Sequence, residues 1–271
     1  KTVDLGAILR GLVWTDDADR LLSVPHAASD GGLGTASSSA AFTFMALPPT
    51  VPYLGDPVEE SFVARLRAYA KDGGAPRRAV LLQGPPGVGK TLLARRIAAA
   101  FRPPGPGGAL VCPSVALVGV DADTLLALVN ILRPAALILN DALDMSYDNA
   151  TDADLAFTEA LHDVGIFAIF THMTATAGPL PYGMRPGRID EIFTLGAPED
   201  VVRRAFFHEH LPTGMHDELV DKLVERSSGL TGAFLVDLCQ RIAVHGASSW
   251  QRELSMILQM VGIQEPRVTK P

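Results

Sequence analysis

The chain has 271 residues, of which 48% are hydrophobic and 20% charged, so it can bury one large core or two modest ones and lacks the composition of a disordered segment. Its formal net charge of −7 argues against broad electrostatic attraction to nucleic acid, and we expect no stable binding of that kind. No apolar run approaches the length of a membrane-spanning helix and no signal segment is evident, which predicts a cytoplasmic protein without a transmembrane segment.

The N-terminal residues give few structural signals. An apolar start and an acidic turn lead into a Gly/Ser-rich stretch over 29–39, which is typical of a loop. The first clear element is a helix predicted over 57–71, because Asp56 is a suitable N-cap and Pro57 suits the first helical position. We treat 1–55 as a segment of uncertain fold, and expect specificity for a client or adaptor to lie there or upstream of it.

A phosphate-binding loop follows the next apolar run. Residues 79–82 predict a strand, Gly-Pro-Pro-Gly-Val-Gly-Lys-Thr over 84–91 matches the pattern GxxxxGK[ST], and 92–101 favour a helix. The glycines of such a loop turn backbone N–H groups toward phosphate, and the helix N-terminus adds partial positive charge. We expect Lys90 to reach the β- and γ-phosphates of ATP and Thr91 to ligate Mg²⁺. The predicted nucleotide-binding residues of this segment are Gly84, Pro85, Pro86, Gly87, Val88, Gly89, Lys90, Thr91 and Leu92.

Strands and helices alternate beyond the loop, and then the strand signal disappears. Further strands are predicted over 109–112, 135–139, 166–170 and 192–195, with helices over 124–132 and 152–164. This alternation predicts an α/β fold with a parallel sheet and helices on both faces. Only helices are predicted after it, over 198–211, 216–226, 232–246 and 249–261. We therefore expect a nucleotide-binding domain over 56–197, a small helical domain over 198–262 and a tail over 263–271.

Two polar residues follow the strand predicted over 135–139. Asn140 and Asp141 occupy the place of the Walker B pair, which usually reads Asp-Glu. Asp141 would contribute to the metal site and orient the attacking water. Asn140 can hydrogen-bond to a metal-bound water, but its neutral amide adds no anionic charge toward Mg²⁺. This departure, whether natural or engineered, predicts slow hydrolysis.

Two arginines precede the last predicted strand. Arg185 and Arg188 are held three residues apart by Pro and Gly. Guanidinium groups suit the spread negative charge of a phosphoryl group in transfer, although such a pair considered alone is equally consistent with a solvated loop.

The order of these motifs resembles the AAA family of ATPases, in which Gly-Pro-Pro-Gly-x-Gly-Lys-Thr, an apolar Walker B strand and Arg-Pro-Gly-Arg-x-Asp follow one another. Residues 228–235 also look like the family's Gly-Phe-Ser-Gly-Ala-Asp-Leu segment at the sensor 2 position, and the resemblance spans about 57–262. It implies a P-loop NTPase sheet of five parallel strands in the order 5-1-4-3-2, with helices on both faces, followed by a small all-α lid.

The resemblance also implies further site residues and partners. Arg185 and Arg188 would act as catalytic residues on ATP bound by the adjacent subunit, so the active form would be a homo-oligomeric ring, a hexamer or a heptamer. Gly232 and Ala233 would lie beside the adenosine. The sensor 1 residue falls on Thr174, with Thr171 and His172 as alternatives at the end of the fourth strand.

Within the family, residues 120–125 and 130–134 are most similar to the AAA chaperone that matures the Rieske subunit of respiratory complex III and to its bacterial relatives. The stretch 117–120 lacks the aromatic-Gly pore loop with which unfoldases grip an extended chain, which argues against threading of unfolded clients.

Three functions follow from these features. The first is an ATP-hydrolysing ring that remodels or translocates a protein client. The second is an ATP-gated assembly or switch module that hydrolyses little because of Asn140. The third is a DNA-directed motor or loader, which the acidic balance disfavours.

Overall fold

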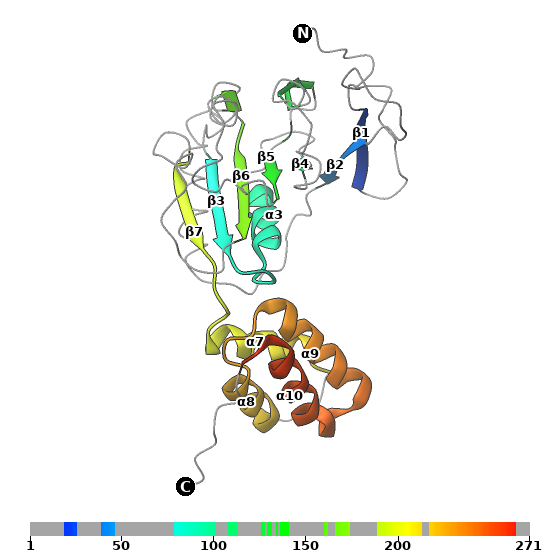
Figure 1. Cartoon of the computed structure of the whole chain (residues 1–271), viewed down its shortest axis with the longest axis vertical. Coiled ribbons are helices and arrows are strands. Elements are labelled where there is room, and N and C mark those ends of the chain that lie inside the picture. Colours follow the sequence, from blue (N-terminus) through cyan, green and yellow to red (C-terminus); the bar gives the residue numbers. More distant parts are fainter. Residues whose placement is uncertain are drawn as a thin grey trace.

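The computed structural model of the chain describes the segments that carry the sheet, the helix after the phosphate loop and the C-terminal helices. The described residues are 19–25, 39–46, 79–100, 108–112, 126–127, 129–131, 134, 136–140, 160–161, 166–173, 189–212 and 217–263. They form a sheet layer, one long helix against it, and a separate group of helices (Figure 1).

The described strands form one seven-stranded sheet. They are β1 (Asp19–Pro25), β2 (Ser39–Ala46), β3 (Ala79–Gly84), β4 (Gly108–Cys112), β5 (Ala136–Leu139), β6 (Ala168–Met173) and β7 (Glu191–Thr194), in the order β1-β2-β4-β5-β6-β3-β7 (Figure 1). The strands β3 to β7 pair in parallel with one another. Read from β7, their order is β7-β3-β6-β5-β4, so the predicted 5-1-4-3-2 order is confirmed.

The sheet is larger than the five strands predicted. β1 and β2 pair antiparallel with each other, and β2 pairs antiparallel with β4. Both strands come from the segment 1–55, whose fold was left uncertain because the Gly/Ser-rich stretch dominated its pattern. That stretch connects the two strands, and the residues before and after it carry the strand structure.

The helix α3 (Lys90–Ala100) packs on the parallel part of the sheet. Its first helical hydrogen bond runs from the Leu93 N–H to the Gly89 carbonyl oxygen, at 2.9 Å. The buried cluster between helix and sheet consists of Val80, Leu82, Leu93, Ala94, Ile97, Ala98, Ala136, Ile138, Phe167 and Ile169. Truncating one of its large aliphatic side chains to alanine typically costs about 2–5 kcal/mol, so this packing fixes the helix against β3, β5 and β6.

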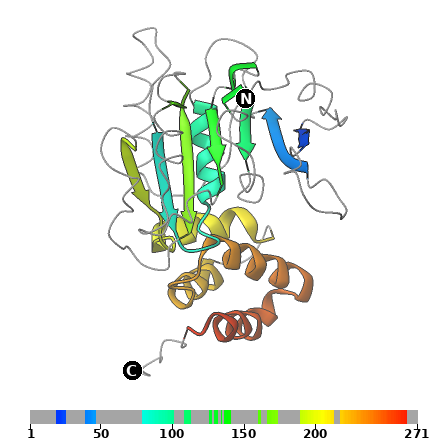
Figure 2. The same ribbon diagram turned by 45° about the horizontal axis from the view of Figure 1, so that its top comes forward.

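Four α-helices and a short 3₁₀ helix form a lid after the sheet. They are α7 (Asp200–His210), α8 (Asp217–Arg226), α9 (Gly232–His245), η2 (Ala247–Ser249) and α10 (Trp250–Val261). The four α-helices begin and end within two residues of the predicted bounds. Figure 2 shows the lid at the end of the sheet where β3 leads into α3.

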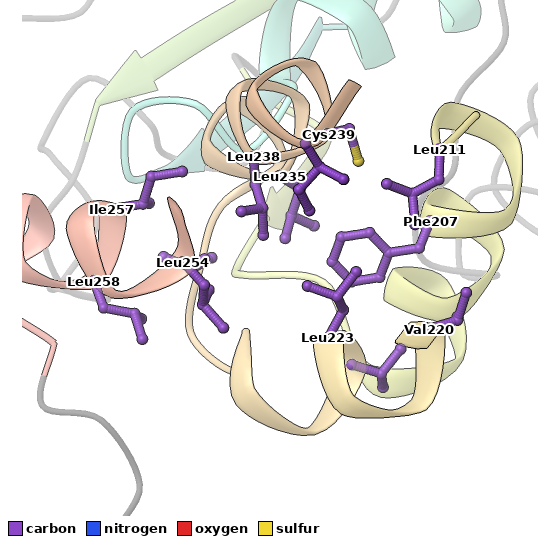
Figure 3. Packing of buried hydrophobic residues seen from close by; sticks show 13 residues of the cluster. Phe207, Leu211, Val220, Leu223, Leu235, Leu238, Cys239, Leu254, Ile257 and Leu258 are labelled. Carbon is purple, nitrogen blue, oxygen red and sulfur yellow. The ribbon is translucent and has the colours of Figure 1, made fainter. Parts of the chain in front are cut away.

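The lid has an apolar core of its own. Phe207, Leu223, Leu235 and Leu254 come from α7, α8, α9 and α10 respectively, and each is fully buried where the four helices meet (Figure 3). In α8, the buried Val220, Leu223 and Val224 lie on one face of the helix, as an amphipathic helix requires.

Candidate nucleotide-binding site

The phosphate loop begins at the carboxyl end of β3, between β6 and β7. Gly84 has φ 151°, and a Cβ at this position would lie 2.3 Å from the carbonyl oxygen of Leu195. A side chain here would therefore collide with backbone at the end of β7. The glycine lets the loop leave the sheet in close contact with the segment that leads to the lid.

Lys90 opens α3 with its side chain turned back over the loop. Its Nζ donates hydrogen bonds of 2.9 Å to the carbonyl oxygens of both Gly84 and Pro85, and the residue is only 7% exposed. These neutral oxygens hold the ammonium in place and add no formal negative charge. The position suits binding of an anionic phosphate, because the ammonium lies on the glycine-rich loop at the N-terminus of α3, where the motif places phosphate.

A hydrogen bond links the phosphate-loop segment to the residue that follows β5. The Thr91 hydroxyl donates to Oδ1 of Asn140 at 3.3 Å, although the two residues are 49 positions apart in the sequence. Both groups are oxygen donors of the kind that Mg²⁺ prefers, and Mg²⁺ needs few protein ligands because it keeps waters and phosphate oxygens. The described residues thus fit Mg²⁺ bound together with a nucleotide.

The lid touches the loop directly. The Ala233 N–H donates a 3.0 Å hydrogen bond to the Gly87 carbonyl oxygen, and a Cβ on Gly232 would lie 3.4 Å from that same oxygen. The two residues expected beside the adenosine therefore lie at the phosphate loop, where α9 begins.

Comparison with known proteins shows which family shares this phosphate loop and the strands around it. The family described as "AAA domain (dynein-related subfamily)" matches residues 79–112, which run from β3 through the loop and α3 to β4. Yta12 of Schizosaccharomyces pombe, a mitochondrial inner membrane m-AAA protease component, is 27% identical over 220 residues, covering 72% of this chain and 28% of that protein. The ATP-dependent zinc metalloprotease FtsH 3 of Sorangium cellulosum is 30% identical over 247 residues, covering 82% of this chain and 40% of that protein. The chain belongs to the AAA family of ATPases.

Solved structures of AAA proteins share the fold. The structure of C. elegans PCH-2 superimposes with a TM-score of 0.61 at 15% identity, covering 88% of this chain and 78% of that one. A structure titled "Structural Basis for Katanin Self-Assembly" gives a TM-score of 0.56 at 16% identity, covering 83% of this chain and 87% of that one.

The AAA chain spans less than half the length of these curated relatives, so their proteolytic activities belong to those proteins. The finer resemblance to the chaperone of the Rieske subunit is not tested by these relatives and stays a prediction.

None of the helices in the described ranges has the length and hydrophobicity that crossing a bilayer requires. The expected cytoplasmic location also stays a prediction.

Several predicted site residues of the AAA chain lie outside the described residues. These are Asp141, Thr174, Arg185 and Arg188. The two alternatives for sensor 1 lie in β6 beside the loop strand, where Thr171 pairs with Leu82 and His172 with Gln83. Thr171 is buried at 1% exposure and His172 is half-buried, and the choice among the three residues stays open.

Two contacts of this AAA domain were not anticipated from the sequence. Gln83, the last side chain before the loop, donates from Nε2 to the Thr194 hydroxyl at 2.8 Å, while its carbonyl oxygen accepts from the Leu195 N–H, also at 2.8 Å. The only indication of these contacts in the sequence is that a polar residue, Gln83, follows the apolar run over 79–82. These bonds attach the loop strand to the end of β7.

The second contact lies at the opposite end of β3. Oδ2 of Asp190 accepts a 2.9 Å hydrogen bond from the Ala79 N–H, and the Asp190 N–H donates to the Ala79 carbonyl oxygen at 2.8 Å. The aspartate that follows the two arginines therefore fixes the exit of their loop against the start of β3.

Proposed function

We propose that this AAA domain binds ATP with Mg²⁺ at the loop after β3 and hydrolyses it, within a homo-oligomeric ring, to remodel or translocate a protein client. The observation that carries the proposal is the hydrogen bond between Thr91 and Asn140, next in sequence to the buried Lys90 of the same loop. It brings together a phosphate-binding loop and the end of a second strand, as nucleotide hydrolysis requires. The curated relatives, which are named as ATP-dependent proteases, support the use of ATP.

Each residue has a distinct proposed role at the phosphates. Lys90 binds the β- and γ-phosphates, and the Thr91 hydroxyl is a ligand for Mg²⁺. When bound, Mg²⁺ supplies positive charge that neutralises the phosphate oxygens. Asn140 accepts from Thr91 or from a water of the metal, and Asp141 orients the attacking water and completes the metal site.

The remaining proposed residues come from the lid, from the segment that follows β6 in the sequence, or from a second subunit, and Thr171 and His172 remain alternatives for sensor 1. Gly232 and Ala233 bind the adenosine side, and Thr174 is the sensor 1 residue. Arg185 and Arg188 of the adjacent subunit stabilise the transferring phosphoryl group, which is the reason for proposing a ring. The client or adaptor would bind outside this generic ATPase unit.

Asn140 supports a second candidate function, an ATP-gated assembly switch. Its amide oxygen occupies the place beside Thr91 where a carboxylate would otherwise lie. Because an amide carries no negative charge, it holds the metal and its waters less strongly than aspartate. Nucleotide binding would then persist while turnover falls.

A steady-state ATPase assay on the assembled protein separates the two candidates. Turnover of about 1–10³ s⁻¹ supports remodelling, since this is the ordinary range for enzymes. Turnover near zero that rises in Asn140→Asp supports the switch. Failure of the wild-type chain to bind ATP in calorimetry contradicts both, and salt-sensitive binding to DNA would favour a DNA-directed motor instead.

A further inference from the structure

Asp190 bonds to both backbone polar groups of Ala79, the first residue of β3. Its Oδ2 accepts a 2.9 Å hydrogen bond from the Ala79 N–H, and its own N–H donates to the Ala79 carbonyl oxygen at 2.8 Å. Ala79 is only 3% exposed. Because a buried donor without an acceptor is unfavourable, the Asp190 carboxylate contributes to holding the segment before β7 against β3.

The residues on either side of Asp190 are fixed as well. Ile189 is buried at 6% exposure, and Glu191 pairs with Val80 at the start of the parallel ladder between β7 and β3 (Figure 1). Asp190 itself is exposed, so its side chain fills no part of the core. What this side chain adds is a directional hydrogen bond at the entry to β7.

We propose that Asp190 is a positioning residue for the arginine loop, by which we mean residues 185–188, and this inference rests on the proposed function. One peptide bond joins Arg188 to the buried Ile189, so the fixed entry to β7 determines where the last arginine of the loop begins. Groups that act on a reacting phosphate must be held closely, since a misplacement of about 1 Å can lower a rate by about a hundredfold. Asp190 therefore contributes to turnover without touching the nucleotide.

The anchor lies at the end of β3 that is remote from the phosphate loop of the same chain. β3 runs from Ala79 to Gly84, and at about 3.3 Å per residue these two residues are roughly 16 Å apart. An arginine attached beside Ala79 is better placed for phosphate held by a neighbouring subunit than for phosphate on its own loop. Loss of the Asp190 hydrogen bond should therefore impair the neighbour's site and leave the chain's own affinity for ATP unchanged.

Two substitutions at this position separate the hydrogen bond from the charge. Asp190→Ala removes the acceptor, whereas Asp190→Asn keeps a side-chain oxygen that can accept from the Ala79 N–H. We expect Asp190→Ala to lower steady-state ATPase turnover by about ten- to a hundredfold, with unchanged ATP affinity in calorimetry. Asp190→Asn should keep nearly the turnover of the wild type.

The matched control is Glu199→Ala. It removes another exposed carboxylate from the chain that follows β7, at the N-cap of α7, where the Glu199 side chain makes no capping hydrogen bond. This variant should hydrolyse ATP like the wild type, and thermal melts of all variants check that each one folds.

An equal mixture of Asp190→Ala and Lys90→Ala subunits distinguishes positioning from damage to the fold. Lys90→Ala lacks the phosphate-binding ammonium but keeps an intact arginine loop, so it supplies its neighbour with what Asp190→Ala lacks. Turnover of the mixture should exceed the sum of the turnovers of the two variants measured separately. A defect within the nucleotide site of the Asp190→Ala subunit itself would not be restored in this way.

Three results overturn the inference while leaving the proposed function in place: wild-type turnover in Asp190→Ala, a loss that mixing does not restore, or an equal loss in Asp190→Asn. If Asp190→Ala does not fold, Asp190→Glu replaces it in the same mixture with the same expected result, because the added methylene moves the acceptor oxygens. By contrast, full activity of Arg188→Ala, or a wild type that hydrolyses no ATP, overturns the proposed function itself.

Discussion

The phosphate loop and the lid both bury charged side chains, and the buried charges of Lys90 and Glu253 have different surroundings. At the phosphate loop, Nζ of Lys90 donates hydrogen bonds to the neutral carbonyl oxygens of Gly84 and Pro85. In the lid, Oε1 of Glu253 accepts hydrogen bonds from Arg252, at 2.6 and 3.0 Å, and lies 3.0 Å from His245 Nδ1. The buried carboxylate of the lid is held by charged neighbours within the lid, whereas Lys90 lies on the loop whose motif binds phosphate.

This contrast suggests how to distinguish a charged side chain that binds a ligand from one that stabilises the fold. Removing a binding charge should weaken ligand binding strongly and leave folding nearly intact. Removing a structural charge should lower stability and leave ligand affinity nearly intact. The following substitutions test the distinction, in order of decreasing expected effect.

Arg188→Ala should have the largest effect, and only on turnover. An arginine that completes the site of a neighbouring subunit typically contributes on the order of 10³-fold or more to phosphoryl transfer. We expect ATPase turnover to fall by about this factor while ATP affinity is retained, as measured by steady-state kinetics and calorimetry. Mixing Arg188→Ala with Lys90→Ala subunits should restore part of the activity, because each supplies what the other lacks. Full activity of Arg188→Ala alone would refute the action in trans.

Lys90→Ala should weaken ATP binding by about a hundredfold, because it removes charged hydrogen bonds to two phosphates. Calorimetry measures the affinity, and a thermal melt without nucleotide serves as the control for folding. An unchanged affinity would mean that the buried ammonium is structural, like the charges of the lid.

Asn140→Asp should raise ATPase turnover by about tenfold, because a carboxylate beside Thr91 holds the metal and its waters more firmly than an amide. The comparison is made at saturating Mg²⁺ and again at limiting Mg²⁺, where the gain should be larger. No gain under either condition would show that the amide does not limit hydrolysis.

Glu253→Gln should have the smallest effect on function and act through stability. Hydrogen bonds from Arg252 lower the pKa of Glu253, burial opposes them, and the hydrogen bond with His245 lowers the pKa further. A lowered pKa in the folded state means that this carboxylate stabilises the lid fully above its ordinary pKa of 4.5, and that the contribution is lost as the pH falls through the folded-state value.

We therefore expect the melting temperature of Glu253→Gln to lie below that of the wild type at neutral pH, with the difference shrinking in acid. Circular dichroism melts at several pH values measure this, and ATP affinity at neutral pH should stay unchanged. A constant difference across the pH range would argue that packing, rather than charge, is what the substitution alters.

Much of the fold was predictable because short apolar strands alternate with amphipathic helices, and this pattern constrains a parallel sheet strongly. The strands β1 and β2 were missed because their connection is rich in glycine and serine and masked the strand residues on either side. The phosphate loop was recognisable because its geometry demands glycines at fixed spacing.

The contacts that link the loop to the rest of the domain were not predictable. Gln83 and Thr194 are 111 positions apart, as are Ala79 and Asp190. Nothing in the local sequence of either partner specifies such a pair. The same is true of Gly87 and Ala233, whose hydrogen bond depends on how the lid docks and only involves backbone atoms.

A structure of the protein with a non-hydrolysable ATP analogue and Mg²⁺ tests the account most directly. We expect the triphosphate within the loop over 84–91, with Lys90 Nζ within hydrogen-bonding distance of the β- and γ-phosphates and Thr91 bound to the metal. A nucleotide bound elsewhere, or a phosphate loop that remains empty at saturating analogue, would contradict it.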